Sequence, residues 1–267
     1  MEKPNDSTSP ARHVVLILQA RMGSARLPGK SMLGLAGAPL LTRILERVRR
    51  SRRADQIVVA TTRNSEDDVL AGLAADHGVA TFRGAENDLV DRYYQAARAF
   101  GADVIVRLPA DNAIPEPAEI DRIIEFHLRG QSEFSSNLAE VFGNGYPDGI
   151  GAEVFDLATL EQVRADCGDP LRREHPHLNF FDYETQTAAR PERYRVGTVR
   201  CPSAFRRPDL RLDVNTRQDY EFMARLYQDL HPGNPQFHIT DVIDWYDNVY
   251  RRAESGASPR FAPAVAG

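Results

Sequence analysis

Residues 13–30 read HVVLILQARMGSARLPGK, in which an apolar run passes directly into a polar loop that contains glycine. The run at 13–18 is rich in β-branched residues, a pattern typical of a strand buried on both faces of a sheet. The loop at 19–30 holds two glycines, one serine, two arginines and one lysine. Ligands of open α/β sheets bind beyond the carboxyl ends of the strands, so this loop is expected to be functional.

Helical and strand patterns alternate after this loop. In chain order we predict a helix that begins at Pro39, a strand at 56–60, a helix from about residue 66 to Gly78, a helix between an Asn87 cap and Gly101, and a strand at 103–108. Such alternation predicts an α/β fold of three layers, with a mostly parallel sheet between two layers of helices.

The second half of the chain is less periodic. We interpret residues 137–208 as a substrate-binding or dimerisation region inserted into a single domain at 13–250. Regular structure is expected to resume with a strand at 210–214, a helix capped by Thr216 and Asp219, and a final helix from Thr240. Residues 1–12 are expected to form a disordered tail and residues 254–267 a flexible one.

Length and composition exclude several classes of protein. A chain of 267 residues with 42% hydrophobic and 27% charged residues fits one α/β domain. The net charge of -5 argues against a general nucleic-acid-binding protein, and no segment resembles a signal peptide or a membrane span. Cys167 and Cys201 lack the spacing of a disulfide framework or a thiolate zinc site. We therefore expect a cytoplasmic protein that binds neither nucleic acid nor membranes.

The loop at 19–30 has the composition of a phosphate-binding site. Its glycines let backbone N–H groups approach phosphate oxygens, Arg21 and Arg26 can make forked contacts, and Lys30 supplies a compact charge. In nucleotidyl transfer this charge would offset that of the departing pyrophosphate. The loop is neither a Walker A motif, which would need glycine where Ser24 stands, nor a GxGxxG motif. A glycine-rich turn with solvated basic residues is the alternative.

Carboxylates at two places are candidate metal ligands. Asp111 follows the strand at 103–108, and Asp213 lies on the strand predicted at 210–214. Magnesium bound to a triphosphate needs one or two carboxylates, although either aspartate alone could equally form a turn or a helix cap.

Polar residues within 137–208 are candidates for binding a second substrate. Asp148 and Glu153 could face a polyhydroxyl molecule, whereas the basic segment RREHPH could bind an acidic one through Arg173 and His175. His175 could also act as a base. A solvated, charged loop is the alternative interpretation of these residues.

Four segments, QARMGSARLPGK, IVVATTRNSEDD, FRGAENDLVDRYYQAA and DVIVRLPADN, resemble the cytidylyltransferase family in their order and spacing. The resemblance is closest to the spore-coat polysaccharide biosynthesis branch, which is related to the acylneuraminate and 3-deoxy-manno-octulosonate cytidylyltransferases. It continues through YPDGIGAEVF and REHPH to RLDVNTRQDYEF and so spans roughly residues 13–230.

This resemblance implies a nucleotide-diphosphosugar-transferase-like fold, usually dimeric, in an enzyme that uses magnesium to attach CMP from CTP to a small acceptor with release of pyrophosphate. The acceptor would be an acidic sugar, a sugar phosphate or a phosphonate, in cell-surface polysaccharide or natural-product biosynthesis. The implied catalytic residues are Arg21, Lys30 and Asp111. The implied nucleotide-binding residues are Gln19, Ala20, Arg21, Met22, Gly23, Ser24, Arg26, Lys30, Thr61, Thr62, Arg83 and Asp111. The acceptor is expected to contact Asn112, Asp148, Glu153, Arg173 and His175, and the metal Asp111, Asp213 and Asn215.

The chain departs from the family pattern at two places. The family often has a Val-Asp-Thr motif whose aspartate binds metal, whereas here the matching residue is Asn215. Asp213 lies two residues earlier and would share a strand face with Asn215, so it could replace that ligand. After Asp111 the chain has Asn112 and Ala113 where the branch commonly shows Cys-Pro, which affects expected acceptor contacts.

Two other functions fit the same pattern. A glycosyltransferase of similar fold would bind a preformed nucleotide sugar and release no pyrophosphate. A non-catalytic protein would bind CTP without turnover, which the presence of Asn215 makes conceivable.

Overall fold

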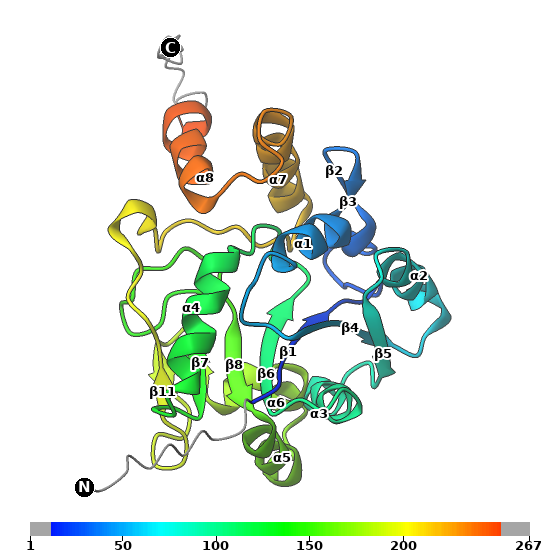
Figure 1. Ribbon diagram of the computed structural model, residues 1–267, viewed down its shortest axis with the longest axis vertical. Helices are drawn as coiled ribbons and strands as arrows, with labels where there is room; N and C mark the ends of the chain where they lie inside the picture. Colours follow the sequence, from blue (N-terminus) through cyan, green and yellow to red (C-terminus); the bar gives the residue numbers. More distant parts are fainter. Residues whose placement is uncertain (1–11, 252–267) are drawn as a thin grey trace, which may run out of the picture.

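The computed structural model describes residues 12–251 (Figure 1). The tail predicted at 254–267 lies outside these residues, as does the tail predicted at 1–12 except for its last residue. That residue, Arg12, donates a hydrogen bond to the carboxylate of Asp156.

A sheet of seven strands forms the middle layer. Its order is β11-β7-β8-β6-β1-β4-β5, and every strand is parallel to its neighbours except β8, which is antiparallel to both β6 and β7. The mostly parallel sheet predicted from the sequence is thereby confirmed. The strands are β1 (Val14–Gln19), β4 (Gln56–Thr62), β5 (Ala80–Gly84), β6 (Val104–Pro109), β7 (Phe134–Ser136), β8 (Glu153–Asp156) and β11 (Val196–Gly197).

The central strand β1 is apolar throughout because both of its faces are covered. Leu16 and Leu18 belong to one hydrophobic core, whereas Val15 and Ile17 belong to the core on the opposite face, and all four are fully buried. Alternation of side chains along a strand explains this division. The run HVVLIL therefore contributes side chains to the hydrophobic cores on both faces of the sheet.

Helices cover both faces of the sheet, which gives the three layers expected (Figure 1). One face packs against α1 (Leu40–Val48), α2 (Asp68–Asp76) and α4 (Pro117–Leu128), and the other against α3 (Leu89–Ala99) and α5 (Leu157–Asp166). The helices α7 (Arg217–Leu230) and α8 (Ile239–Trp245) extend the first of these cores beyond the sheet (Figure 1). The remaining elements are the short α6 (Pro170–Glu174), a π-helical turn at Tyr246–Tyr250, and two hairpins, β2–β3 (Gly34–Leu35 with Ala38–Pro39) and β9–β10 (Phe181–Asp182 with Thr187–Ala188). Short 3-10 helices lie at Lys30–Met32, Ser65–Asp67, Pro176–Asn179 and Ser203–Phe205.

Several local predictions need correction. The strand β5 and the helix α4 were not predicted. The cap of α3 is Asp88, whose side chain accepts a hydrogen bond from the Asp91 N–H, rather than Asn87. Residues 210–214 form only isolated bridges, in which Asp213 pairs with Asn112, rather than a strand. The capping box of Thr216 and Asp219 at the start of α7 is confirmed.

The segment 137–208 is not merely attached to the sheet. It supplies β8 and β11, and β8 lies between β6 and β7. Its role in acceptor binding or dimerisation remains a prediction.

The order of the strands places a crevice beside β1. The chain passes from β1 to β4 and β5 on one side and then returns to place β6 on the other side. Ligands of open α/β sheets bind where the strand order reverses in this way, beyond the carboxyl ends of the strands. Here those ends are Gln19 of β1 and Pro109 of β6, which are register partners.

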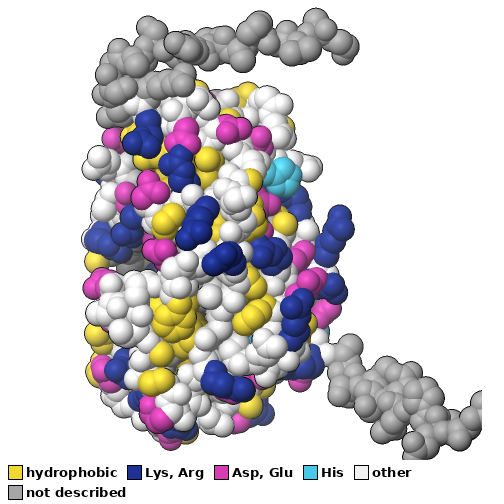
Figure 2. Space-filling view, turned by 90° about the vertical axis from the view of Figure 1, so that its left-hand side faces the viewer, with side chains coloured by type: hydrophobic (Ala, Val, Ile, Leu, Met, Phe, Trp, Pro, Cys, Tyr) yellow, Lys and Arg dark blue, Asp and Glu magenta, His cyan; other side chains and the backbone are white. Residues whose placement is uncertain are grey.

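The surface carries charges of both signs. Figure 2 shows basic and acidic side chains interspersed with hydrophobic ones on one face, and not a continuous basic area. Among residues 12–251, no helix has both the length and the apolar character needed to cross a membrane.

Candidate active site

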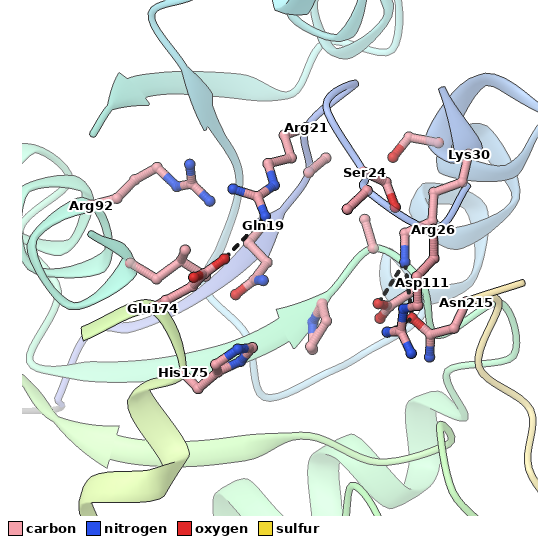
Figure 3. Close-up of a pocket in the computed structure, with 16 residues that line it drawn as sticks. Gln19, Arg21, Ser24, Arg26, Lys30, Arg92, Asp111, Glu174, His175 and Asn215 are labelled. Carbon is pink, nitrogen blue, oxygen red and sulfur yellow. Dashed lines mark hydrogen bonds and ion pairs between the residues drawn. The ribbon is translucent and has the colours of Figure 1, made fainter. Parts of the chain in front are cut away.

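A cavity of about 270 Å³ opens at the carboxyl ends of β1 and β6 (Figure 3). Figure 3 shows two groups of polar side chains in it. Arg26, Lys30, Asp111 and Asn215 form what we call the carboxylate end, and Arg21 and Arg92 form the arginine end, beside Gln19, Glu174 and His175. The cavity is lined by Gln19, Ala20, Arg21, Ser24, Ala25, Arg26, Lys30, Ser31, Leu89, Arg92, Pro109, Ala110, Asp111, Glu174, His175 and Asn215.

The loop that follows β1 folds back on itself. The carbonyl oxygen of Met22 accepts hydrogen bonds from the N–H groups of Ser24 and Gly29, both at 2.8 Å. Gly29 has a φ of 72°, a left-handed conformation that other residues rarely adopt. This return of the chain brings Lys30, at the start of a short 3-10 helix, to the same cavity as Arg21 and Arg26.

A buried carboxylate fixes the beginning of this loop. Asp67 is fully buried and accepts hydrogen bonds from the Met22 N–H at 2.7 Å, and from the N–H and hydroxyl of Thr62. Burial alone would raise the pKa of Asp67, but the hydrogen bonds from Thr62 and Met22 outweigh it and lower that pKa. An ionised Asp67 therefore ties the loop after β1 to the end of β4.

Replacing Asp67 with asparagine is expected to loosen the loop. The amide N–H₂ of the new asparagine would face the hydrogen-bond donors of Met22 and Thr62, so the free energy of unfolding should fall by about 1–3 kcal/mol. Urea denaturation at neutral pH would measure this loss. Binding of a nucleoside triphosphate should weaken by roughly tenfold. The control is Asp68→Asn, which makes the same change of charge at an exposed neighbour paired only with Arg83. Equal nucleotide binding by both variants would show that Asp67 does not set the loop conformation.

Lys30 joins the loop to the carboxylate end. Its Nζ donates to Asp111 Oδ2 at 2.8 Å, to the Val214 carbonyl at 3.0 Å and to Asn215 Oδ1 at 3.3 Å. Arg26 Nη2 donates to the same Asn215 oxygen at 2.8 Å. Three oxygens from two distant parts of the chain thus converge on one cation.

The carboxylate end fits a magnesium ion. Carboxylate, carbonyl and amide oxygens are the donors that magnesium prefers, and those of Asp111, Val214 and Asn215 already surround the charge of Lys30. Burial, with the negative charges of Asp213 and Asp111, raises the pKa of Asp148 to about 7. Within residues 12–251, however, no three Asp, Glu, His or Cys side chains form a complete metal site by themselves. A metal here would need ligands from the substrate or water.

Asp213 acts on Asn215 rather than on the cavity. The Asn215 amide nitrogen donates to Asp213 Oδ2, and Asp213 is also paired with Arg211 at 3.2 Å. This contact turns the Asn215 oxygen toward Lys30 and Arg26. Asp213 itself does not line the cavity.

The arginine end carries more positive than negative charge. Arg92 is 1% exposed, forms no ion pair within the described residues, and donates to the Ala85 carbonyl at 2.9 Å. Burial lowers the pKa of Arg92, and the charge of nearby Arg21 lowers it further. Arg21 has one carboxylate partner, Glu174, at 3.1 Å. Two close guanidinium groups with one carboxylate favour an anionic ligand.

Gln19 presents a defined group to the cavity. Its Oε1 accepts a hydrogen bond from the Tyr93 hydroxyl at 2.9 Å. Burial raises the pKa of Tyr93, so its hydroxyl stays protonated and can donate. The amide N–H₂ of Gln19 is then available to a ligand.

Comparison with known proteins agrees with this geometry. Residues 15–230 match the cytidylyltransferase family, which is well over half of the chain. The chain belongs to this family. It is therefore a nucleotidyltransferase by class.

Relatives of this cytidylyltransferase cover most of its length. The spore coat polysaccharide biosynthesis protein SpsF of Bacillus subtilis is 33% identical over 80% of this chain and 86% of its own. A 3-deoxy-manno-octulosonate cytidylyltransferase of Anaeromyxobacter dehalogenans is 31% identical over 68% of this chain and 80% of its own. A solved structure of a cytidylyltransferase from Leptospira borgpetersenii superposes with a TM-score of 0.78 at 29% identity, covering 95% of this chain and all of that one.

Several residues expected to bind nucleotide in this cytidylyltransferase lie behind the cavity wall. Thr61 and Thr62 are buried at the end of β4, and Thr62 is engaged by Asp67. Arg83 folds onto that strand end, where it donates to the carbonyls of Thr62 at 2.8 Å and Asn64 at 2.7 Å. Met22 and Gly23 belong to the loop but do not line the cavity. The other expected nucleotide-binding residues do line it.

Among the expected acceptor-binding residues, only His175 lines the cavity. Glu153 is fully buried, and its carboxylate accepts hydrogen bonds from Arg107 Nη1 at 2.5 Å and from the Tyr183 hydroxyl at 2.9 Å. These partners offset the cost of burying a carboxylate. Arg173 is held by Asp88 at 2.8 Å, which joins α6 to the start of α3. Asn112 and Asp148 lie beside the carboxylate end without lining the cavity.

Sequence reasoning missed Arg92, Glu174 and the anchor Asp67. Arg92 did carry a signal, because it is a charged residue within the apolar pattern of α3, next to the buried Tyr93. An arginine in such a position needs a buried partner or a ligand.

Proposed function

We propose that this enzyme transfers CMP from CTP to a small anionic acceptor and releases pyrophosphate, with magnesium as cofactor. The observation that carries the proposal is a single cavity with the cations of Arg21, Arg26 and Lys30 on one loop and the oxygens of Asp111 and Asn215 opposite. Membership of the cytidylyltransferase family supports cytidine as the nucleoside.

The cations would act on the leaving group. An acceptor oxygen attacks the α-phosphorus, a new O–P bond forms, and the bond between the α-phosphorus and the bridging oxygen breaks as pyrophosphate departs. Negative charge then grows on pyrophosphate, where Arg21, Arg26 and Lys30 stabilise it. Since these groups lie on a loop held by Asp67, little reorganisation is needed during the reaction.

Asp111 and the oxygen of Asn215 would hold magnesium, whose role is to neutralise charge on the α-phosphate oxygens. Because Asn215 is uncharged, Asp111 contributes the only negative charge among the side chains that line this end. The amide of Asn215 is kept in its ligating orientation by Asp213.

The arginine end supports an acidic acceptor. Arg92 lacks a carboxylate partner in the described part of the chain, and a carboxylate, phosphate or phosphonate group of the acceptor would supply one. This agrees with an acidic sugar, a sugar phosphate or a phosphonate as acceptor, in the biosynthesis of polysaccharides or natural products.

His175 is proposed as the base when the acceptor group is a hydroxyl. Burial lowers the pKa of His175, so the imidazole is neutral at pH 7 and a ring nitrogen can take the acceptor proton. We expect kcat/KM to rise with pH through a pKa below 6.5 and then level off. In His175→Gln that acidic limb should disappear; an unchanged limb would assign the titration to another group.

We also propose that the enzyme is a cytoplasmic homodimer. Apart from the family resemblance, the support is that segment 137–208 exposes large apolar side chains, with Phe142 55% and Leu171 58% exposed. Light scattering of the purified protein would give its mass in solution, and a monomer at all concentrations would contradict the dimer.

The proposed reaction is tested in two steps. Thermal unfolding with CTP, UTP, ATP or GTP, each with and without magnesium, should show a magnesium-dependent rise in Tm that is largest for CTP, because a ligand that binds the folded state stabilises it. Pyrophosphate release is then assayed with CTP and a set of acidic sugars, sugar phosphates and phosphonates. Stabilisation by a nucleotide sugar but not by CTP would instead favour glycosyl transfer.

A further inference from the structure

A second cavity, of about 370 Å³, lies where the carboxyl-terminal ends of α1 and α7 meet the segment after α7. It shares no lining residue with the candidate active site. Its walls are made by Arg43, Glu46, Arg47, Arg50, Tyr227, His231, Pro235 and Gln236.

The charges of this second cavity are not balanced. Three arginines and one glutamate line it, and that glutamate, Glu46, is engaged by Arg43 at 2.9 Å. The carboxylate closest to Arg47 is Glu116 at 3.7 Å, which already accepts hydrogen bonds from His238 and Ile239. Across residues 12–251, Arg50 has no ion pair. The second cavity is therefore a local positive site on a chain of net charge -5.

Hydrogen-bond donors in these arginines are also unused. Arg47 is 3% exposed, and its Nε and Nη1 donate to the carbonyls of Pro115 and Phe237, both at 3.0 Å. Its Nη2, and the Nε and Nη2 of Arg50, are buried and have no hydrogen-bond partner in the part of the chain that is described. Burial lowers the pKa of Arg47, which reflects this incomplete compensation. Buried donors without acceptors are strongly unfavourable, so a ligand with several acceptor oxygens would fit.

We propose that the second cavity binds the phosphate or diphosphate group of a small molecule. Arg47 lies in the last turn of α1 and Arg50 lies two residues beyond its end, and both line the second cavity, so their guanidinium groups can act on one ligand. Guanidinium donors suit tetrahedral oxyanions, which offer more acceptors than a carboxylate. The volume lies within the range of small-molecule sites. The proposal is independent of the proposed reaction, because it involves none of its residues.

Titration calorimetry with inorganic pyrophosphate, in the absence of nucleotide, tests this inference. The wild-type protein should bind two equivalents, one at the loop after β1 and one at the second cavity. Arg50→Gln should lose one equivalent or bind it at least about tenfold more weakly, and Lys30→Ala should affect the other. The matched control is Arg49→Gln, the same change at an exposed neighbour outside the cavity, which should behave as wild type.

Arg50→Lys is a second, more conservative variant that tests the same binding event if Arg50→Gln fails to fold. It keeps the charge but cannot replace both unpartnered donors, so it should weaken the same binding event severalfold. Unchanged pyrophosphate binding in both Arg50 variants, or an absence of binding outside the Lys30 site, would overturn the proposal. Since turnover of CTP does not enter the measurement, failure of the proposed reaction would be seen separately.

Discussion

Replacing Lys30 with alanine is expected to lower kcat at least about a hundredfold, with a smaller effect on the binding of CTP. The ammonium group lies 2.8 Å from Asp111 and at the end of the loop that would hold the triphosphate, so its charge acts where negative charge develops. Steady-state assays of pyrophosphate release would separate kcat from KM.

Lys30→Arg is the informative companion variant. Apart from position 3, lysine occurs in this sequence only at position 30, and arginine is by far the more common cation. The three oxygens around Nζ suit the three donors of an ammonium group and not a planar fork, so arginine should restore little activity. A kcat close to that of the wild type in Lys30→Ala would remove this residue from the mechanism.

Replacing Asp111 with asparagine should also lower kcat by about a hundredfold or more, and it should abolish the magnesium-dependent part of stabilisation by CTP. Asp111 provides the negative charge among the side chains that line the carboxylate end, and the neutral Asn215 cannot compensate for its loss. Both effects are measured on one preparation, by turnover and by Tm with CTP at several magnesium concentrations.

The control for this variant lies just before the same strand. Asp103→Asn makes the same change beside the opposite end of β6, where the carboxylate accepts a hydrogen bond from the His13 N–H at 2.7 Å. It should leave turnover and magnesium dependence unchanged. If Asp111→Asn still shows the full magnesium effect, the metal is held elsewhere.

Much of the first half of the chain was predictable because β1, β4, β6 and the helices α1, α2 and α3 have a clear period, although α4 was not predicted. The run at 13–18 is apolar on both faces, and its loop is rich in cations, so both the strand and the candidate phosphate site followed from local sequence. The strand β5 was missed because ATFRG at 80–84 is only partly buried and has no such run. Strand β8 lies within an irregular region, and its position between β6 and β7 depends on long-range pairing.

Candidate residues on the loop were easier to find than residues that contact the loop but lie far from it in the sequence. Asp67 is separated from Met22 by the β2–β3 hairpin, α1 and β4, so its role as an anchor depends on topology. Glu153 was assigned to the acceptor because a charged residue beside an irregular loop suggests exposure, whereas it lies directly opposite Arg107 on the neighbouring strand. A sequence gives no sign that two charges so far apart neutralise each other.

The buried pair of Arg107 and Glu153 constrains how this family member can diverge. Replacing either partner alone would leave an uncompensated charge in the core and lower the free energy of unfolding by about 3–5 kcal/mol. An apolar pair in both positions could be tolerated. The substitution of one residue is therefore conditional on the other. Positions 107 and 153 should covary among related sequences. A redesign of the centre of the sheet would have to replace both residues together.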